Sequence, residues 1–315
     1  MLRYLARRIL LLLLTFFLSS ALIFALTQLL PGDIALLVLG RDAQPEAIEQ
    51  FNNRFGLNDP PLLQYGRWLF NFTTGDWGRS YTAGNPDVRS LVTNRLGNST
   101  VLAVFTLVVA IPLAVSLGVI AALYEGRWVD GLISFISLSV VGLPEFVTGI
   151  ILINVFALGL GWFDTTSLVR EGYSIGDWLR VLTLPMITAS FVLIGYVTRM
   201  ARAGMIDELQ RSYVRTAILK GLPYRTVILR HVLRNALLPT ITVIAISIGW
   251  LMGGLVVIET IFNYPGMGSE MVRAVTQKNL PVLQAIAVLI IFIFAAANLI
   301  ADLLYAALNP RIRLN

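Results

Sequence analysis

Three acidic residues lie within or at the ends of the long apolar runs of this 315-residue sequence: Glu145, Glu259 and Asp302. A charged side chain at membrane depth is costly, so each of the three is a candidate for function. Glu259 and Asp302 lie near the ends of their runs, where they can reach water. We therefore interpret these two carboxylates as structural or interfacial.

Glu145 differs because it follows Gly142-Leu143-Pro144, a sequence that favours a break in the helix. A broken helix that carries a carboxylate can line a substrate path. Alternatively, the third apolar run ends at Val141 and the chain re-enters after a bend. Both interpretations stay open, and Glu145 is our candidate pathway residue.

Few other residues of this chain could perform chemistry. The absence of cysteine excludes disulfides and thiolate metal sites. The lone histidine, His231, supports neither a His-based metal site nor a catalytic triad, so we interpret it as a surface or packing residue. The sequence also has no G-x-x-x-x-G-K-[ST] motif for nucleotide binding. Because the mid-membrane ionisable groups of proton- or sodium-coupled carriers are nearly absent as well, a transporter built from this chain needs an ATPase partner.

The composition is that of a membrane protein. Hydrophobic residues make up 57% of the chain and charged residues 13%, against about 25% charged residues in soluble domains. The net charge of +6 could indicate nucleic-acid binding. However, the basic residues cluster beside apolar runs, so membrane topology explains them better.

Six apolar runs mark the elements that must position these residues. The runs are residues 10–30, 99–124, 131–163, 181–198, 236–258 and 280–301. We read each as one membrane span, the fourth being the shortest. Ser19-Ser20-Ala21 would suit a signal-peptide cleavage site, but the first run is longer than a typical signal-peptide core, so we predict an uncleaved span. Six spans place both termini on the same side of the membrane.

Basic residues indicate that this side is the cytoplasm. On the predicted cytoplasmic side lie Arg3, Arg7, Arg8, Arg127, eight basic residues from Arg199 to Arg234, Arg311 and Arg313. The short loops on the opposite side carry Arg170, Arg180, Arg273 and Lys278. This asymmetry follows the positive-inside rule, which does not apply to a connection as long as 31–98.

The segment 199–235 is a basic interruption between two apolar runs. Residues 205–220 can form one helix, Gly221-Leu222-Pro223 stops it with the glycine as cap, and 224–233 can form a second helix. Such a pair would present a rigid projection to a cleft on a soluble partner. The alternative is a basic helix pair bound to anionic lipid, and charge alone does not decide between them.

The long outer connection is not expected to be disordered. Pro31-Gly32-Asp33 ends the first helix. Residues 48–57 carry apolar side chains at partly helical spacing, and 65–72 carry an aromatic cluster. Either a small capping subdomain of short helices lies over the outer face, or the aromatics form an interfacial belt. Further on, Pro265-Gly266 predicts a turn in the last outer loop, and Pro310 stops the final helix.

Residues 213–221 read Tyr-Val-Arg-Thr-Ala-Ile-Leu-Lys-Gly. They resemble the coupling-loop motif of membrane subunits of binding-protein-dependent ABC importers, in the form of the dipeptide/oligopeptide/nickel branch. Other segments resemble this branch in order and at the right spacing, so the resemblance covers nearly the whole chain. Residues 231–239, 253–268, 298–305 and 309–311 resemble the branch in general. Residues 30–33, 55–60, 64–65, 75–80 and 95–96 resemble its B-type permease.

The resemblance implies an all-α polytopic membrane protein of the bacterial inner membrane, with six transmembrane helices and both termini in the cytoplasm. Its core would be a MetI-like type I ABC importer permease with an extra extracytoplasmic subdomain after the first helix. Residues 1–98 would form the N-terminal transmembrane helix and the extracytoplasmic helical segment. Residues 99–315 would form a five-helix permease core with a cytoplasmic coupling loop at 199–235.

The resemblance also implies a function. The chain would be a permease subunit of an ATP-driven importer, not an enzyme, and would form half of a pathway for di- or oligopeptides. Its partners would be a second, C-type permease, two cytosolic ATPase subunits that bind ATP and magnesium, and an extracytoplasmic solute-binding protein; the chain itself would hold no cofactor. Alternative cargoes are nickel, glutathione-like compounds and oligosaccharides. A stand-alone secondary carrier, or a channel or scaffold without an energy source, is a different class of alternative.

The motif places five residues at the ATPase contact: Arg215, Thr216, Ala217, Lys220 and the turn residue Gly221. Small Ala217 would suit close approach to a cleft. The chain departs from the family pattern at Ser212, where an acid is common, and at Ile218, where a basic residue is common, which would retune docking. Gly97 replaces a usual proline. Pro144-Glu145-Phe146 replaces a more apolar triplet, so Glu145 would be specific to this transporter.

Overall fold

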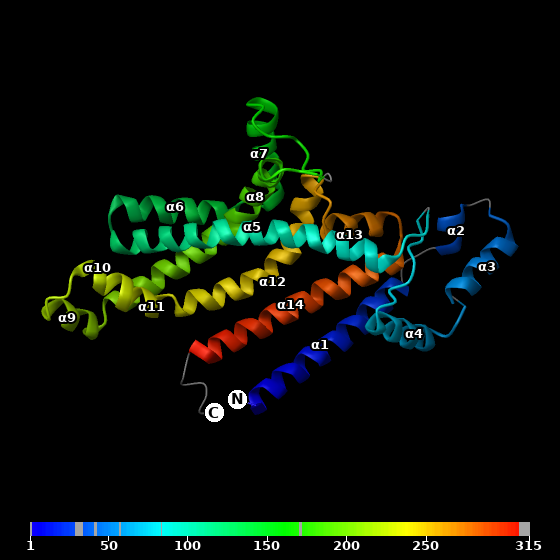
Figure 1. Ribbon diagram of the computed structural model, residues 1–315, viewed down its shortest axis with the longest axis horizontal. Coiled ribbons are helices and arrows are strands. Elements are labelled where there is room, and N and C mark those ends of the chain that lie inside the picture. Colours follow the sequence, from blue (N-terminus) through cyan, green and yellow to red (C-terminus); the bar gives the residue numbers. More distant parts are fainter. Residues whose placement is uncertain are drawn as a thin grey trace. The chain divides into compact units, whose positions relative to one another are not determined.

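The computed structural model describes residues 2–28, 34–40, 43–56, 58–82, 84–169 and 172–308, and these residues are helical except for loops and one isolated β-bridge between Arg79 and Asp87 (Figure 1). Packing divides the chain into two compact units. The N-terminal unit comprises Leu2–Ser99 with Pro265–Ala295, and the central unit comprises Thr100–Tyr264 with the chain from Ala296. A packing unit need not be a domain, so the division into 1–98 and 99–315 stays a prediction.

The helices of the N-terminal unit are α1 (Leu2–Gln28), α2 (Ile34–Leu39), α3 (Pro45–Phe55), α4 (Pro61–Thr74) and α13 (Met267–Thr276). The central unit holds α6 (Trp128–Gly142), α7 (Glu145–Leu152), η1 (Ile153–Gly159), α8 (Ile175–Leu209), α9 (Ser212–Leu219), α10 (Tyr224–Thr226), η2 (Val227–Val232), α11 (Leu233–Ala236) and α12 (Leu238–Ile261). Two helices have residues in both units: α5 (Val88–Leu123) and α14 (Leu280–Leu308).

Five of the six predicted spans are single helices among the described residues, and the remaining one is sharply bent. The five are α1, α5, α8, α12 and α14, each long and apolar enough to cross a membrane; the bent pair α6 and α7–η1 is either a broken sixth span or a re-entrant segment. Both α5 and α8 extend well beyond the apolar runs 99–124 and 181–198. At the start of α8, Ser174 and Asp177 form a reciprocal capping box, which stabilises helix in a polar segment.

The helix break before Glu145 is also confirmed. α6 ends at Gly142, and α7–η1 leaves it at an angle of 104°. Leu143 is extended, with φ −91° and ψ 129°, because the residue before a proline is driven out of the helical region. Pro144 then lies in the N-cap position of α7, where its missing N–H costs nothing. The third apolar run is therefore two helices that meet at a sharp bend.

Short helices follow α1 in the N-terminal unit, as predicted. Their aromatic side chains pack on one another along α4: the rings of Trp68 and Phe72 stack at 5.6 Å and those of Phe72 and Trp77 at 5.0 Å. Trp68 also lies 6.0 Å from Phe24 of α1. This mutual packing favours a small subdomain over an interfacial belt. Its place over the outer face stays a prediction, and residues 31–33 lie outside the described residues.

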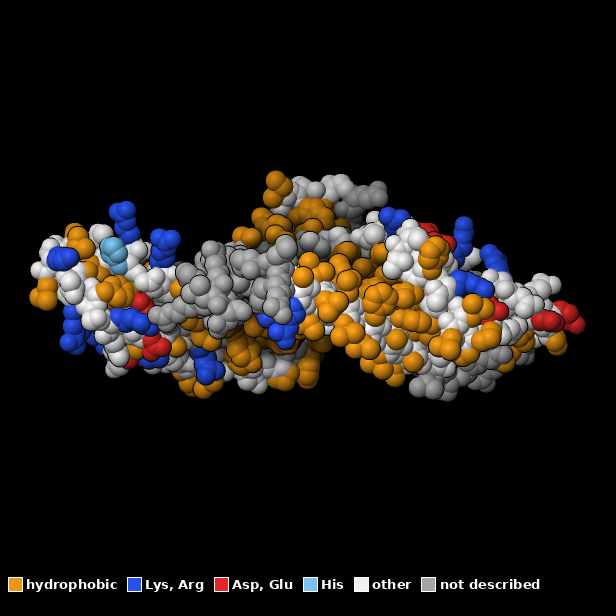
Figure 2. Space-filling model, turned by 90° about the horizontal axis from the view of Figure 1, so that it is seen from below, with side chains coloured by type: hydrophobic (Ala, Val, Ile, Leu, Met, Phe, Trp, Pro, Cys, Tyr) orange, Lys and Arg blue, Asp and Glu red, His pale blue; other side chains and the backbone are white. Residues whose placement is uncertain are grey.

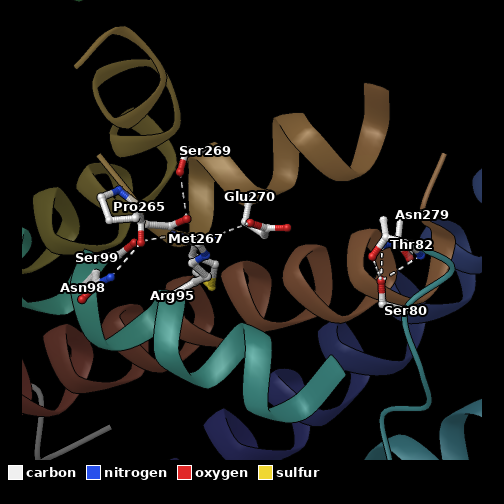
Figure 3. Close-up of polar contacts among 11 residues, drawn as sticks. Ser80, Thr82, Arg95, Asn98, Ser99, Pro265, Met267, Ser269, Glu270 and Asn279 are labelled. Atoms are coloured by element: carbon white, nitrogen blue, oxygen red, sulfur yellow. Dashed lines mark hydrogen bonds and ion pairs between the residues drawn. The ribbon is translucent and has the colours of Figure 1, made fainter. Parts of the chain in front are cut away.

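Polar contacts hold α13 against the start of α5 within the same unit (Figure 3). Asn98 donates to the Pro265 carbonyl at 2.8 Å, and the Met267 N–H donates to Ser99 Oγ at 2.8 Å. Arg95 pairs with the buried carboxylate of Glu270 at 3.1 Å. The sequence predicted only a turn at Pro265-Gly266; the turn is followed by a helix whose first residues are bonded to α5.

Candidate functional site: the loop between α8 and α12

The predicted helix over residues 205–220 is wrong. Residues 205–209 continue α8, the chain turns at Gln210 and Arg211, and α9 begins at Ser212. Arg211 is extended, with φ −69° and ψ 146°, and its guanidinium pairs with Glu208 at 3.0 Å. The turn separates α9 from α8, so α9 is an eight-residue helix of its own.

The predicted stop at Gly221 is confirmed. Gly221 has φ +77°, the left-handed region that glycine adopts without strain. Its N–H bonds the carbonyl of Ile218 at 2.9 Å, and the Leu222 N–H bonds that of Ala217 at 3.3 Å. These are the two hydrogen bonds of a Schellman motif, which satisfies the last carbonyls of α9 and reverses the chain. The second helix then runs without a gap from Tyr224 to Ala236 as α10, η2 and α11.

A hydrophobic core fastens this loop to the end of α8. Its buried residues are Ala122, Met205, Val214, Val227, Ile228, Val232 and Ala236. The π-helical turn of η2 explains how Val227 and Val232, five residues apart, both face inward. Gly204 of α8 lets the backbone of Ala236 approach so closely that any Cβ at Gly204 would overlap its carbonyl. The loop is therefore a packed extension of the spans.

A second fastening is polar and is built on the tyrosine of the motif. Tyr213 OH donates to Glu208 Oε1 at 2.9 Å and accepts from Asn235 Nδ2 at 3.4 Å. It thereby joins the end of α8, the start of α9 and α11. Burial raises the pKa of the Tyr213 hydroxyl, so it stays a neutral donor at physiological pH. The tyrosine has an internal structural role.

The exposed side of the loop combines basic and large apolar side chains. Arg215, Thr216, Lys220 and Gly221 are exposed, as expected for docking residues. Ala217 is half-buried and packs on the loop's own core, so its small size is already used within this chain. Sequence reasoning missed the apolar members. They are Ile218, Leu219, Leu222 and Tyr224, which are 46, 88, 39 and 56% exposed.

The surface of the loop differs from that of the spans. In Figure 2, hydrophobic side chains cover the spanning helices on the face shown, whereas Lys and Arg gather around the loop that carries the histidine. His231 is exposed on η2, at the rim of a groove of about 470 Å³ between α9 and η2. Its position agrees with the interpretation as a surface residue.

The signal that could have identified Leu219 was a leucine in a basic segment just before a helix-ending glycine.

An ion pair braces α8 where it approaches the loop. Arg202 Nε donates to Asp130 Oδ1 at 2.6 Å and Arg202 Nη2 donates to Oδ2 at 2.8 Å. Asp130 also accepts from the Gly126 N–H at 3.0 Å, and its side chain is only 8% exposed. The pair ties the first turn of α6 to α8. Sequence reasoning counted Arg202 as a topology charge and missed Asp130, which lies one residue before the predicted third run.

The three membrane carboxylates differ in their surroundings. Glu259 is fully buried at 0% exposure, so the expectation that it reaches water is wrong. The chain turns back over the end of α12, where the Tyr264 N–H bonds the Glu259 carbonyl at 2.8 Å and the Tyr264 ring is itself buried. Asp302 is half-buried, in keeping with an interfacial position, and Glu145 is half-buried at the bend. Residues 170 and 311–313, assigned to opposite sides of the membrane, lie outside the described residues.

Comparison with known proteins decides what such a molecule is. Residues 114–314 match the family described as "Binding-protein-dependent transport system inner membrane component", and residues 1–118 match the N-terminal region of such membrane components. The chain belongs to this family. It is thus a multi-pass permease component of the inner membrane, and it works with an ATPase and a binding protein. The resemblance found in the sequence is confirmed.

Two relatives match over nearly their full length. One is a Brucella abortus (strain 2308) protein named as a peptide transport system permease, 37% identical over 294 residues, which are 93% of each chain. Another is the glutathione transport system permease protein of Escherichia coli (strain K12), 36% identical over 313 residues, which are 99% of each chain.

Within the described part of the chain, no group of three or more His, Cys, Asp or Glu residues could hold a metal ion.

Proposed function

We propose that this permease forms half of the translocation pathway of an importer for peptides, either di- and oligopeptides or a peptide-like compound such as glutathione. The names of its relatives support this cargo class. Nickel and oligosaccharides, the other cargoes of the branch, find no such support among these relatives. The other half of the pathway would be a second, C-type permease.

We further propose that the loop of α9 to α11 is the contact with the ATPase, on the side of the membrane where both termini lie. The observation that carries this proposal is the exposure of large apolar side chains on a rigidly packed, basic projection. Leu219 at 88% exposure lies beside Lys220 and Gly221 at the tip of α9. Exposed apolar surface rimmed by charge is typical of an interaction site. Arg215 and Thr216 lie one turn earlier on the same helix.

Coupling would then proceed by rigid-body motion. ATP binding closes a pair of ATPase subunits. Each subunit then displaces the permease loop that is bound to it, which in this chain is the loop of α9 to α11. Because the projection shares a buried core with Met205 of α8, its displacement is passed to α8 and from there to the pathway. A soft loop would absorb the motion, whereas close-packed side chains transmit it.

The alternative in which the loop lies on anionic lipid is less well supported. A helix that binds at a membrane interface buries its apolar face in the lipid. In α9 the inward residues Val214 and Ala217 already pack on the loop's own core, and the exposed Ile218 and Leu219 lie at the tip of the helix and do not form a stripe along its length. The basic residues would still favour a cytoplasmic location beside anionic headgroups.

The test is purification of the tagged permease in mild detergent, followed by identification of the proteins that accompany it. We expect a second permease and P-loop ATPases to co-purify with the wild type. Leu219→Asp should release the ATPases and leave the second permease bound, because it places a charge at the proposed contact.

The matched control is Leu62→Asp in α4, since Leu62 is 86% exposed but lies in the other packing unit. Retention of the ATPases by Leu219→Asp would refute the docking assignment. Recovery of the wild-type chain alone under several gentle conditions would refute the proposed assembly.

A further inference from the structure

A carboxylate without a partner lies at the bend of the third span. Among the described residues, none donates a hydrogen bond or pairs a charge with the side chain of Glu145, which is half-buried in the first turn of α7. Arg202, by contrast, is engaged by Asp130 in the same unit. An uncompensated carboxylate in apolar surroundings is costly, and within a membrane such a side chain is a candidate for a site on the substrate or ion path.

The neighbouring wall of this carboxylate is α12. A Cβ atom at Gly254 would lie only 3.2 Å from Glu145 Oε1, so the glycine leaves room for the carboxylate beside the α12 backbone. Gly254 is 16 residues into the 24-residue α12, about 24 Å along a helix of about 36 Å at 1.5 Å per residue. The carboxylate thus lies well inside the span, away from both ends of α12.

Two aromatic rings extend this wall. Trp250 precedes Gly254 by four residues and therefore lies on the same face of α12. Its ring meets that of Tyr196 from α8 edge-on, with centroids 6.5 Å apart, and the two side chains are 46 and 49% exposed. Within the described part of the chain, neither the Trp250 N–H nor the Tyr196 hydroxyl has a hydrogen-bond partner.

We propose that Glu145, Trp250 and Tyr196 form a site in the pathway that receives the positively charged amino terminus of the cargo. The carboxylate supplies the opposite charge, and the faces of tryptophan and tyrosine attract a cation as well. The free N–H and hydroxyl groups can pair with peptide carbonyls. The inference rests on the proposed peptide cargo and specifies which end of the peptide this permease recognises.

Other occupants fit the site less well. A bound metal ion needs several oxygen or nitrogen ligands, and the described residues offer a single carboxylate here. A lipid-facing carboxylate would lie in hydrocarbon with no counter-charge. A basic residue of the second permease could neutralise Glu145 as well, and the experiment separates this case from recognition of the cargo.

The experiment uses the complete transporter, with both permeases and the ATPases, in proteoliposomes with its binding protein. The probes are trialanine and N-acetyl-trialanine, each supplied at a concentration that saturates the binding protein. We expect Glu145→Gln to lower trialanine uptake about tenfold or more, the range for loss of a charged hydrogen bond, and to leave acetylated uptake unchanged. The ratio of the two effects cancels the selectivity of the binding protein. ATP hydrolysis stimulated by each loaded binding protein gives a second readout if acetylated uptake is slow.

Control variants separate recognition from structural damage. Glu125→Gln removes an exposed carboxylate from the turn after α5 and should change neither uptake. Trp250→Leu should lower trialanine uptake more than acetylated uptake, whereas Trp250→Phe keeps an aromatic face and should do so less.

The outcomes distinguish the two proposals. Equal loss of both uptakes in Glu145→Gln would mean that Glu145 pairs with the second permease or holds the fold, and would overturn this inference alone. No loss of either uptake would overturn it as well. A wild-type transporter that imports neither trialanine nor glutathione would instead refute the proposed cargo, and this inference with it.

Discussion

Removal of the guanidinium of Arg202 tests whether the ion pair between Arg202 of α8 and Asp130 of α6 holds the two helices together. Arg202→Met keeps most of the side-chain length but leaves Asp130 with the Gly126 N–H and a distant Ser134 hydroxyl at 3.3 Å. Breaking a buried ion pair from one side costs about 3–5 kcal/mol. The Arg202 side chain is 31% exposed, so water can enter in its place and we expect about 2–4 kcal/mol.

The assay is thermal unfolding of the purified transporter in detergent. At about 2 °C per kcal/mol for a chain of this size, Arg202→Met should lower Tm by about 4–8 °C. Arg202→Lys keeps the charge but cannot bond both carboxylate oxygens, so it should lose less. Asp130→Asn combined with Arg202→Met should be less destabilising than the sum of the single variants, because the buried charge is gone.

The same variants should also impair coupling. Since Arg202 lies between the loop and the body of α8, its loss should raise the ATP hydrolysed per cargo molecule imported. A Tm of Arg202→Met within 1 °C of wild type, or additive single and double variants, would refute the brace.

Two further predictions concern the loop and the N-terminal unit. Gly221→Val places a β-branched residue at φ +77°, which should abolish transport while membrane insertion, measured by protease protection, stays normal; normal transport would contradict the turn-and-dock mechanism. Asn279→Ala should remove the bond that Ser80 Oγ accepts at 2.7 Å and the bond that the Tyr81 N–H donates at 3.2 Å, a cost of about 2 kcal/mol. Limited proteolysis should then cleave the connection at 76–87 faster, and Asn279→Asp, which still accepts from Tyr81, should be cleaved at an intermediate rate.

The sequence predicted those parts of the fold that depend on local patterns. Apolar length revealed the candidate spans, Pro144 revealed the bend in one of them, and Gly221 revealed the end of α9. In each case a single residue type or run is enough, because backbone sterics or bilayer thickness determines the outcome.

The parts that it missed depend on contacts outside the apolar periodicity. The turn at Gln210 and Arg211 interrupts a stretch with good helix formers, because Tyr213 bonds to Asn235, which is 22 residues away. The burial of Glu259 accompanies a shorter-range contact, in which the chain turns back at the end of α12 and the Tyr264 N–H bonds the Glu259 carbonyl. No periodicity encodes either contact.

The packing of α8 indicates how a displacement of the loop is carried into the membrane. Where α8 meets α5, a Cβ at Gly118 would lie 2.6 Å from the Thr198 carbonyl, and Thr198 Oγ1 bonds the Ala114 carbonyl at 3.1 Å. Where it meets α6, a Cβ at Gly195 would lie 2.8 Å from the Ser137 carbonyl. Helices that approach this closely through glycine cannot slide past one another without steric overlap. Motion of the loop should therefore shift α8 together with α5 and α6.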